Sequence, residues 1–404
     1  MSGNARENGM KVIGIDGMED RVYVLLSVPS NWRGFLYRQS IPVPITQYAM
    51  PRLDLGHLYE ATRTAKKVVV VDLGFLGDSL HLVPALWEIR DHYPQAELHV
   101  LSSPLGAEVI GLAPCVDRVW PVELAPEKRT WREQWRLVRA LRRERFDMAF
   151  NLSGSDRTII MTALTAARWR VAHAAGRKHF WNRWLIANWA PRQDTDLTVF
   201  EQRRRVLAEC GFKLEPARFD LRVDEASIRW AATAVPPGAI HLSVNSANPL
   251  KEWPLEHHVA LLKRLWDFRP ELRVVVSAAA KPSEQERLQQ LAGTVHDARL
   301  QALPERLTIR QLAGALRRCR LHIGPDSGVL HLAWALGVPT LSLFREQGAY
   351  RAWLPRGAAN QVVSVPCTCV DHYEAPCEHL GRAECLARIQ PAQVAEIVCE
   401  QLKT

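Results

Sequence analysis

Short apolar segments alternate with longer helical stretches from Lys66 onward, and this alternation limits the fold more than any other feature of the sequence. Such a pattern is typical of a parallel sheet whose strands are buried on both faces by the connecting helices. The first set of expected strands spans residues 68–73, 97–101, 118–122, 148–152 and 169–172. Helices are expected near residues 79–92, 104–112, 130–145 and 156–167. This set predicts one doubly wound α/β domain.

A second set of the same kind follows the stretch rich in aspartate and proline around residues 214–238. Its strands are expected at residues 240–244, 273–277, 321–324 and 340–344, with helices near 255–267, 283–292, 308–318 and 328–336. A chain of 404 residues also exceeds the usual size of one hydrophobic core. We therefore expect two Rossmann-like domains, residues 66–225 and 226–350, that face a central cleft where ligands bind at the carboxyl ends of the strands.

The two ends of the chain differ from these sets. Residues 1–65 contain two short alternating runs, at residues 12–15 and 22–26, and the sequences Asp16-Gly17 and Glu19-Asp20 separate them. This pattern is typical of a hairpin, so we predict a small β-rich extension. Pro42, Pro44 and Pro51 suggest an irregular link into the main body. Residues 351–404 are expected to form a cysteine-containing loop and a C-terminal helix.

Charge, the lack of export signals and the cysteines indicate the expected partners and cellular location of the protein. The net charge of +9 is spread over a chain with 43 acidic residues, which indicates a basic surface suited to nucleic acid, acidic lipid or a phosphorylated glycan. The sequence shows neither a secretory signal nor a membrane-spanning segment, so we expect a cytoplasmic protein with reduced cysteines. Cys115, Cys210 and Cys319 lie in apolar contexts and are expected in the core.

The first strand-to-helix junction that suggests chemistry contains Gly74, Gly77 and Asp78. Its two glycines let the backbone turn tightly beside a ligand, and Asp78 reaches the crevice at the start of a helix. Asp78 is equally suited to capping that helix, and the sequence leaves both interpretations open. A dinucleotide site is disfavoured because the G-x-G-x-x-G spacing is missing.

A second junction begins with Asp326, Ser327 and Gly328 and has His331 one turn inside the following helix. Free amides and the positive end of the helix dipole favour a phosphate there. The alternative for His331 is a packed or exposed histidine without a ligand.

A third junction runs from Ser246 to the sequence Lys251-Glu252-Trp253-Pro254. Lys251 can neutralise a departing diphosphate, although a lone lysine is more often a solvated surface residue. After the next strand, the Glu284 carboxylate can accept hydrogen bonds from ribose hydroxyls. The same segment also matches a capping box made by Ser283 and Glu286.

These three junctions, in this order, resemble glycosyltransferase family 9, the heptosyltransferases, whose architecture is GT-B. The resemblance covers roughly residues 66–400. It implies that Asp78 is the catalytic base and that Glu284 contacts the ribose. It further implies that the remaining donor-binding residues are Ser246, Lys251, Asp326, Ser327, Gly328 and His331. The family often has two hydroxyl residues where this chain has Ser246 and Ala247, so one of them is missing here.

The reaction implied is an inverting transfer of heptose from ADP-heptose to the inner core of lipopolysaccharide at the inner face of the inner membrane. One carboxylate takes the acceptor proton while ADP leaves, so no cofactor or metal is required at the reaction centre. The sequence Asp194-Thr195-Asp196 matches the metal-binding motif of another glycosyltransferase fold but lacks the flanking strands. Two alternatives are a heptosyltransferase acting on autotransporter proteins and a non-catalytic protein that binds nucleotide sugars.

Two further clusters stand outside the junctions. Cys367, Cys369, Cys377 and Cys385 are close enough in sequence to hold a structural zinc or iron, the alternative being free thiols. In some relatives that act on autotransporters, a cysteine cluster near this point forms an iron-binding finger.

The second cluster is basic, lies between residues 168 and 205, and suits a phosphorylated acceptor better than single-stranded nucleic acid. It includes Arg168, Arg170, Arg177, Lys178, Arg203, Arg204 and Arg205. A basic amphipathic helix near residues 131–141 is expected to turn its apolar stripe to the core, and peripheral contact with anionic membrane is the alternative.

Overall fold

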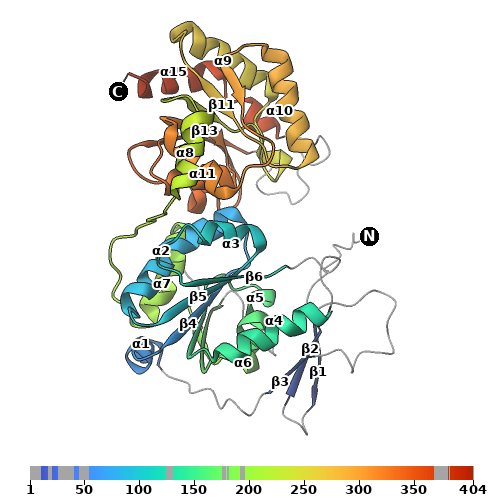
Figure 1. Cartoon of the computed structure of the whole chain (residues 1–404), viewed down its shortest axis with the longest axis vertical. Coiled ribbons are helices and arrows are strands. Elements are labelled where there is room, and N and C mark those ends of the chain that lie inside the picture. The colour runs from blue at the N-terminus through green and yellow to red at the C-terminus, as the bar shows by residue number, and fades with distance from the viewer. Residues whose placement is uncertain are drawn as a thin grey trace, which may run out of the picture. The chain divides into compact units, whose positions relative to one another are not determined.

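Two six-stranded parallel sheets form the framework of the protein (Figure 1). The computed structural model describes residues 11–16, 21–25, 41–44, 54–123, 131–174, 179, 182–191, 196–367, 381 and 383–403. The chain divides into two units, and each unit contains one of the large sheets. Residues Met1–Asp194 and Phe200–Arg218 make the first unit, and Thr195–Val199 and Phe219–Thr404 make the second.

The sheet of the first unit has the strand order β6-β5-β4-β7-β8-β9. These strands are β4 (Lys67–Val71), β5 (Glu97–Ser102), β6 (Arg118–Pro121), β7 (Met148–Asn151), β8 (Trp169–His173) and β9 (Asn188–Ala190). The central strand contains the valine run of residues 68–71, in which every side chain is completely buried. Valine side chains are branched and carry no polar group, so this segment is suited to the buried middle of the sheet.

Helices flank this sheet (Figure 1). They are α1 (Leu58–Thr62), α2 (Leu76–His92), α3 (Pro104–Ile110), α4 (Trp131–Glu144), α5 (Asp156–Leu164), α6 (Asn182–Leu185) and α7 (Val199–Glu209). The four helices predicted for this unit are confirmed as α2 to α5, with ends shifted by a few residues. β9, α6 and α7 were not predicted.

The sheet of the second unit has the order β12-β11-β10-β13-β14-β15. Its strands are β10 (Ile240–Leu242), β11 (Val274–Val276), β12 (Leu300–Ala302), β13 (Leu321–Pro325), β14 (Thr340–Glu346) and β15 (Asn360–Pro366). The helices are α8 (Glu225–Ala234), α9 (Leu255–Phe268), α10 (Pro282–Val295), α11 (Ile309–Arg318), α12 (Gly328–Ala335), α14 (Glu384–Ala387) and α15 (Pro391–Gln401). The predicted α/β fold with two doubly wound domains is therefore confirmed.

The C-terminal segment completes the second hydrophobic core. Leu386 and Val398 are fully buried and belong to the same cluster as Val276 and Leu262. Because these side chains are buried against the second sheet, the hydrophobic effect holds the C-terminal segment in this unit.

The N-terminal extension contains an antiparallel sheet of β1 (Lys11–Asp16), β2 (Arg21–Leu25) and β3 (Ile41–Pro44). The predicted hairpin is confirmed, because Val12 pairs with Val24. The irregular link expected at Pro42 and Pro44 is wrong, since both prolines lie in β3. Among the described strands β3 pairs only with β2, and an edge strand tolerates prolines because one side needs no N–H donors.

In the described part of the chain, no helix is both long enough and apolar enough to cross a membrane.

Candidate active site

The strand order of the second sheet brings two of the predicted junctions together. β10 and β13 are neighbours, with Leu242 opposite Ile323, and the strand order reverses between them. Ligands of open α/β sheets bind outside the carboxyl ends of the strands at such a point. The residues that follow these strands touch each other, because the Ser246 hydroxyl donates a hydrogen bond to the backbone carbonyl of Asp326 at 3.1 Å.

Asp326 holds two of the predicted donor-binding side chains. Its Oδ2 lies 2.5 Å from Lys251 Nζ, and its Oδ1 lies 3.5 Å from His331 Nε2. Burial acts to raise the pKa of Asp326, but the hydrogen bond from His331 and the charge of Lys251 outweigh it and keep the pKa below its usual value. The carboxylate therefore stays ionised and orients one ammonium group and one imidazole.

The position of Lys251 depends on the neighbouring tryptophan. Trp253 is completely buried, and its indole N–H donates to the carbonyl of Ile389 at 3.1 Å. Arg287 donates to the carbonyls of Val244 and Trp253 and so joins the two arms of the loop that contains Lys251. The loop is thus fixed at both ends, which reduces the entropy lost when Lys251 meets a ligand.

Helix α12 presents its N-terminus at the same edge. The Ser327 hydroxyl caps the helix by accepting the amide of Leu330 at 3.4 Å. The remaining amides of the first turn and the helix dipole favour an anion such as a phosphate. His331 is only 2% exposed, and its ring centroid lies 5.6 Å from that of Trp353. Predicted residues Asp326, Ser327, Gly328 and His331 therefore form one continuous feature.

A hollow beside the N-terminus of α12 is also lined by side chains that were not predicted from the sequence. Lys251 and Asp326 line it together with Arg345, Tyr350 and Trp353. Arg345 Nη1 is buried and has no hydrogen-bond partner within the described residues. Arg345 lies near the carboxyl end of β14, the strand next to β13. Its place directly after the strand predicted at residues 340–344 was the available signal.

Glu284 lies on the neighbouring loop of the same edge. Its backbone carbonyl accepts the Asn245 side-chain amide at 3.2 Å, and its Oε2 accepts the amide of Ala279 at 3.1 Å. The capping box suggested for Ser283 and Glu286 does not form, because α10 already begins at Pro282 and Ser283 lies within it. Pro at this position fixes the helical φ angle and moves the helix start upstream.

In the first unit, Gly74 and Asp78 follow the central strand β4. The Asp78 Oδ2 accepts the backbone amide of Phe75 at 3.0 Å, so this carboxylate caps α2. A Cβ atom on Gly74 would lie 2.3 Å from Asp78 Cβ, which shows why only glycine fits there. Gly77 lies in the first turn of the same helix. Asp78 remains 30% exposed, so capping fixes the carboxylate without burying it.

Arg203 contacts two aspartates at the junction of β4 and α2. Its Nη2 lies 2.8 Å from Asp72 Oδ2 and 3.8 Å from Asp78 Oδ1, and its Nη1 donates to the Asp78 carbonyl. Arg203 and Arg204 were expected on a basic surface, and this expectation is wrong. They are 5% and 8% exposed, and Arg204 pairs with the buried carboxylate of Glu88. Buried arginines need such carboxylate partners.

Of the basic residues assigned to the acceptor side, the two that the structure describes lie away from the edge that carries Asp78. Arg168 is exposed but precedes β8, and it therefore lies at the amino edge of the sheet, opposite the edge that carries Asp78. Arg170 lies within β8 and is 2% exposed. Arg177 and Lys178 lie outside the described residues, as does Asp194 of the alternative metal motif.

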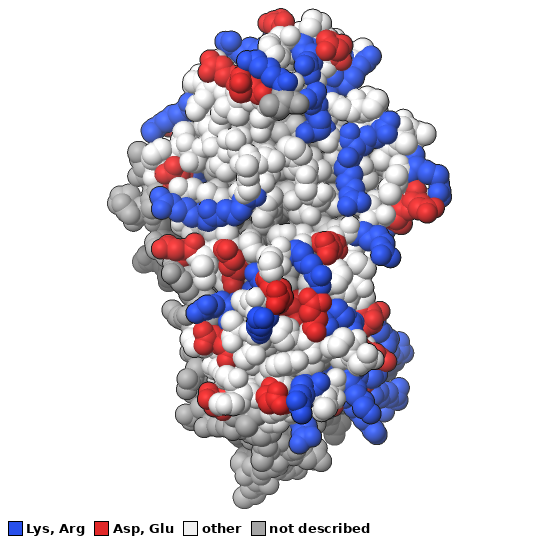
Figure 2. Space-filling view, turned by 90° about the vertical axis from the view of Figure 1, so that its left-hand side faces the viewer, with Lys and Arg blue, Asp and Glu red and all other residues white. Residues whose placement is uncertain are grey.

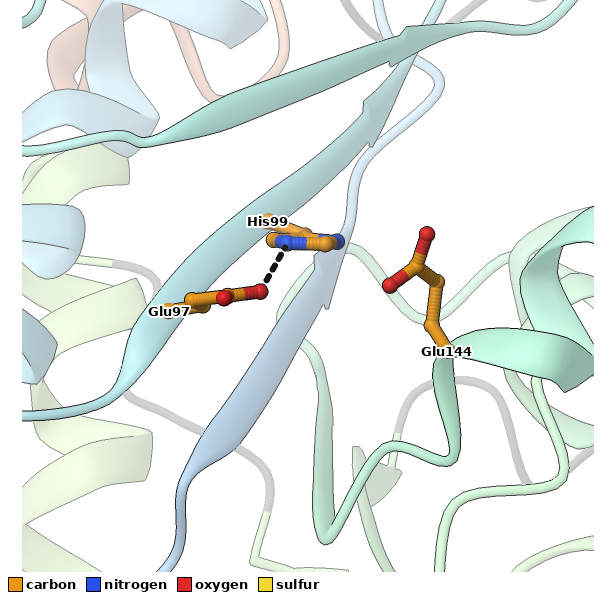
Figure 3. A group of neighbouring side chains, drawn as sticks. All are labelled: Glu97, His99 and Glu144. Carbon is orange, nitrogen blue, oxygen red and sulfur yellow. Dashed lines mark ion pairs between the residues drawn. The ribbon is translucent and has the colours of Figure 1, made fainter.

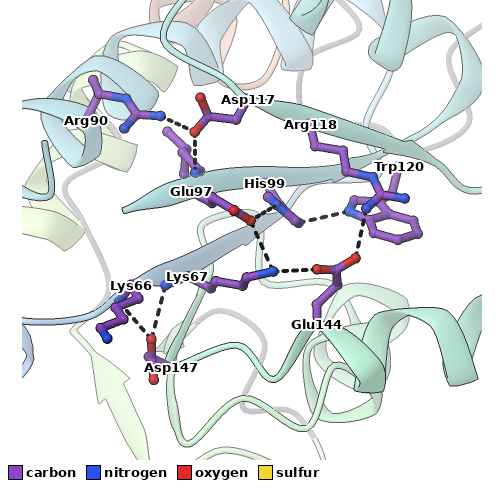
Figure 4. A network of polar contacts seen from close by, with 11 residues as sticks. Lys66, Lys67, Arg90, Glu97, His99, Asp117, Arg118, Trp120, Glu144 and Asp147 are labelled. Atoms are coloured by element: carbon purple, nitrogen blue, oxygen red, sulfur yellow. Dashed lines mark hydrogen bonds and ion pairs between the residues drawn. The ribbon is translucent and has the colours of Figure 1, made fainter. Parts of the chain in front are cut away.

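Glu97, His99 and Glu144 come close enough to suggest a metal site (Figure 3). Lys67 Nζ, however, lies 3.1 Å from Glu97 and 2.7 Å from Glu144 (Figure 4). Hydrogen bonding by Lys67 keeps the pKa of both carboxyl groups below their usual values. His99 Nδ1 accepts the indole N–H of Trp120 at 3.2 Å. These atoms already have partners, and the cluster is an ion-pair network at the amino edge of the sheet.

The cysteines divide into two groups. Cys115, Cys210 and Cys319 are buried, as predicted, and burial raises the pKa of each thiol to about 12. Cys367 and Cys385 are also buried, and both belong to the core of the second unit. Cys369 and Cys377 lie outside the described residues.

Comparison with known proteins adds independent information. A family model, glycosyltransferase family 9 (heptosyltransferase), matches residues 134–380. The chain is 27% identical over 297 residues to lipopolysaccharide heptosyltransferase 1 of Pseudomonas aeruginosa, covering 69% of this chain and 78% of the relative. It is 20% identical over 306 residues to the lipopolysaccharide core heptosyltransferase OpsX of Haemophilus influenzae, covering 75% of this chain and 86% of the relative.

Solved structures share the fold. The family 9 glycosyl transferase from Veillonella parvula superposes with a TM-score of 0.69 at 20% identity, covering 87% of this chain and 99% of that structure. The ADP-heptose lipopolysaccharide heptosyltransferase II of Escherichia coli superposes with a TM-score of 0.67 at 18% identity, covering 83% of this chain and 98% of that structure. The family model spans more than half of the chain, so the protein belongs to glycosyltransferase family 9, the heptosyltransferases, and is a glycosyltransferase.

Proposed function

We propose that the protein is a GT-B enzyme that transfers heptose from ADP-heptose to the inner core of lipopolysaccharide, with inversion, at the cytoplasmic face of the inner membrane. The observation that carries this proposal is the Asp326 carboxylate, which holds Lys251 and His331 beside the N-terminus of α12. This arrangement suits the diphosphate of a nucleotide sugar. The names of the related heptosyltransferases support the sugar and the acceptor.

In the proposed reaction, Asp78 removes the proton from the acceptor hydroxyl. The oxygen then attacks the anomeric carbon of the heptose, the bond to the diphosphate breaks, and ADP leaves with the bonding electrons. Lys251 and the amides of α12 stabilise the negative charge that develops on the diphosphate. Ser246 and Glu284 complete the donor site, with Glu284 assigned to the ribose.

Substitutions of Asp78 and of Lys251 test proton removal and diphosphate binding separately. Asp78→Asn should reduce transfer by about 10³-fold and leave ADP affinity unchanged, because the base touches the acceptor proton. Lys251→Ala should weaken ADP binding roughly 10-fold and lower turnover, because a charged hydrogen bond to the diphosphate is lost. ADP release with heptose-deficient inner-core lipopolysaccharide measures transfer, and calorimetry measures ADP affinity.

Lys263→Ala serves as the matched control, since this exposed lysine lies on α9, away from the junctions. Full transfer by Asp78→Asn would contradict the assignment of Asp78 as the base, and unchanged ADP binding by Lys251→Ala would contradict the assigned diphosphate site.

A second acceptor class is an autotransporter polypeptide, which the same assay can test. The three-stranded N-terminal sheet favours this alternative, because it is an addition to the two domains. Transfer to the polypeptide alone would replace lipopolysaccharide as the acceptor.

The cysteine cluster is proposed to hold a structural zinc or iron. Two of its thiols fit this role, because Cys367 follows the end of β15, Cys385 lies in α14, and both are buried in one core. Such an ion would tie Cys367 and Cys385 to each other. We expect one metal ion per chain by elemental mass spectrometry, and its loss in Cys385→Ser but not in Cys399→Ser. A metal-free wild-type protein that keeps its thermal stability would contradict the proposal.

A further inference from the structure

Helix α4 carries four arginines on one side. Arg132, Arg136, Arg139 and Arg143 are all exposed, and their spacing of four, three and four residues recurs at the helical repeat. At 3.6 residues per turn, the four side chains fall within an arc of about 60° and extend over roughly 16 Å of the helix axis. We call these four residues the arginine face.

The opposite side of α4 fixes this face toward solvent. Val138 and Leu141 are 1% and 0% exposed and pack into the core beneath the sheet, together with Val69 of β4. Glu144 at the C-terminal end pairs with Lys67 and Arg118 (Figure 4). The helix is therefore held by its apolar side and its last turn, and it cannot rotate without breaking these contacts.

Most of the positive charge on this face is uncompensated. Within the described residues, Arg136, Arg139 and Arg143 have no carboxylate partner. On the face drawn in Figure 2, by contrast, acidic side chains lie among many of the basic ones. Three guanidinium groups in a row without carboxylate partners in the described residues are suited to a surface of phosphates, because each guanidinium can bind a phosphate with two parallel hydrogen bonds.

The occupant that fits best is a phospholipid membrane rather than a nucleic acid. Single-stranded nucleic acid binds through aromatic rings that stack on bases, whereas Trp135 of α4 packs against the core. A convex row of arginines with no apolar side chain between them matches the headgroup layer of an anionic leaflet, which attracts each nearby Arg.

We propose that the arginine face of α4 docks the protein on anionic phospholipid headgroups. The inference deepens the proposed function, because a lipid-linked acceptor is presented at such a surface. Docking is electrostatic and shallow, since the apolar side of α4 is already used by the core. It holds the enzyme at the membrane independently of donor and acceptor.

Binding of the full chain to vesicles tests this inference. Wild type should co-sediment with vesicles of phosphatidylglycerol and phosphatidylcholine, but not with phosphatidylcholine alone, and 1 M salt should release it because the Debye length falls to about 3 Å. The triple variant Arg136→Gln, Arg139→Gln, Arg143→Gln should bind the anionic vesicles on the order of 100-fold more weakly. The matched control removes the same charge from the second unit, by Lys263→Gln, Arg264→Gln and Arg317→Gln, and should bind like wild type.

The inference would be overturned if both triple variants lost vesicle binding equally, or if the α4 variant lost none. So would binding of single-stranded RNA that depends on the arginine face while the vesicles remain unbound. Transfer to a soluble, lipid-free core oligosaccharide should be unchanged in the α4 variant. Absence of heptose transfer by wild type with intact vesicle binding would overturn the proposed function alone, so the two failures are distinguishable.

Discussion

At the scale of single residues, both a local and a long-range contact hold Asp78. The amide of Phe75 is a local partner three residues away, whereas Arg203 reaches Asp78 from 125 residues further along the chain. Arg203 also pairs with Asp72, which is completely buried. One guanidinium therefore supports both carboxylates of the loop.

Arg203→Gln should impair the enzyme in two ways. It should lower the free energy of unfolding by about 3 kcal/mol, because the buried Asp72 loses its partner. It should also lower kcat about 100-fold with unchanged donor KM, because Asp78 loses its fixed position. Denaturant unfolding and steady-state kinetics measure the two effects.

Arg204→Gln is the appropriate control for this substitution. Arg204 is the next residue of the same helix and pairs with buried Glu88 instead. This variant should lose similar stability but retain kcat per folded molecule. If both variants lose kcat equally, Arg203 acts through general stability and does not position Asp78.

The sequence singled out Asp78, Lys251, Asp326 and His331 as candidates because each belongs to a local pattern at a strand end. It did not reveal the contact that Arg203 of α7 makes with Asp72 after β4 and with Asp78 in α2. Only the folded chain creates that contact.

At the scale of elements, close contacts fix the turn between β4 and α2. Gly74 has its amide bound to Asp72 at 2.9 Å and its carbonyl bound to the Ser103 hydroxyl at 2.7 Å. No side chain fits between this backbone and Asp78. The turn therefore fixes where the carboxylate stands.

Gly74→Ala should displace Asp78 and reduce transfer about 100-fold, since the added Cβ would lie 2.3 Å from Asp78 Cβ. The free energy of unfolding should fall by about 1–3 kcal/mol, as for other overpacked sites. Gly293→Ala in α10 is the control, because no atom lies within 4 Å of its added Cβ. That variant should keep full activity and gain up to about 1 kcal/mol. Normal transfer by Gly74→Ala would show that the turn does not fix the base.

Elements were predictable where their pattern was long or strongly apolar. The valine run of β4 and the helix α9 are examples. β9 and β12 have only three residues each, too few to show a period. Pairing with a neighbouring strand, rather than their own sequence, places such short segments in a sheet.

At the scale of the whole molecule, buried histidines make stability depend on pH. His241, His258 and His322 are 0% exposed and lie in the second unit. Burial lowers the pKa of His241 to about 4 and that of His258 to about 3, and it lowers the pKa of His322 as well. The unfolded chain binds these protons at about pH 6.5, before the folded chain does.

The free energy of unfolding should therefore be greatest above pH 6.5 and should fall as the pH drops from 6.5 toward 4. Each histidine should contribute a slope of up to about 1.4 kcal/mol per pH unit, because the unfolded state binds more protons in this window. Urea unfolding between pH 7.5 and 4.5 measures the slope. His258→Leu removes one such group and should flatten the dependence, and an unchanged slope would show that His258 does not titrate as proposed.

The two large sheets repeat one strand order, in which the first and fourth strands of each set stand side by side. Each unit also has its own hydrophobic core. Changes in the loops after β4 and β7 therefore leave intact the separate core that supports Lys251 and Asp326. Under the proposed function, such modularity would allow descendants of one ancestral enzyme to diversify their acceptors while inheriting the same donor.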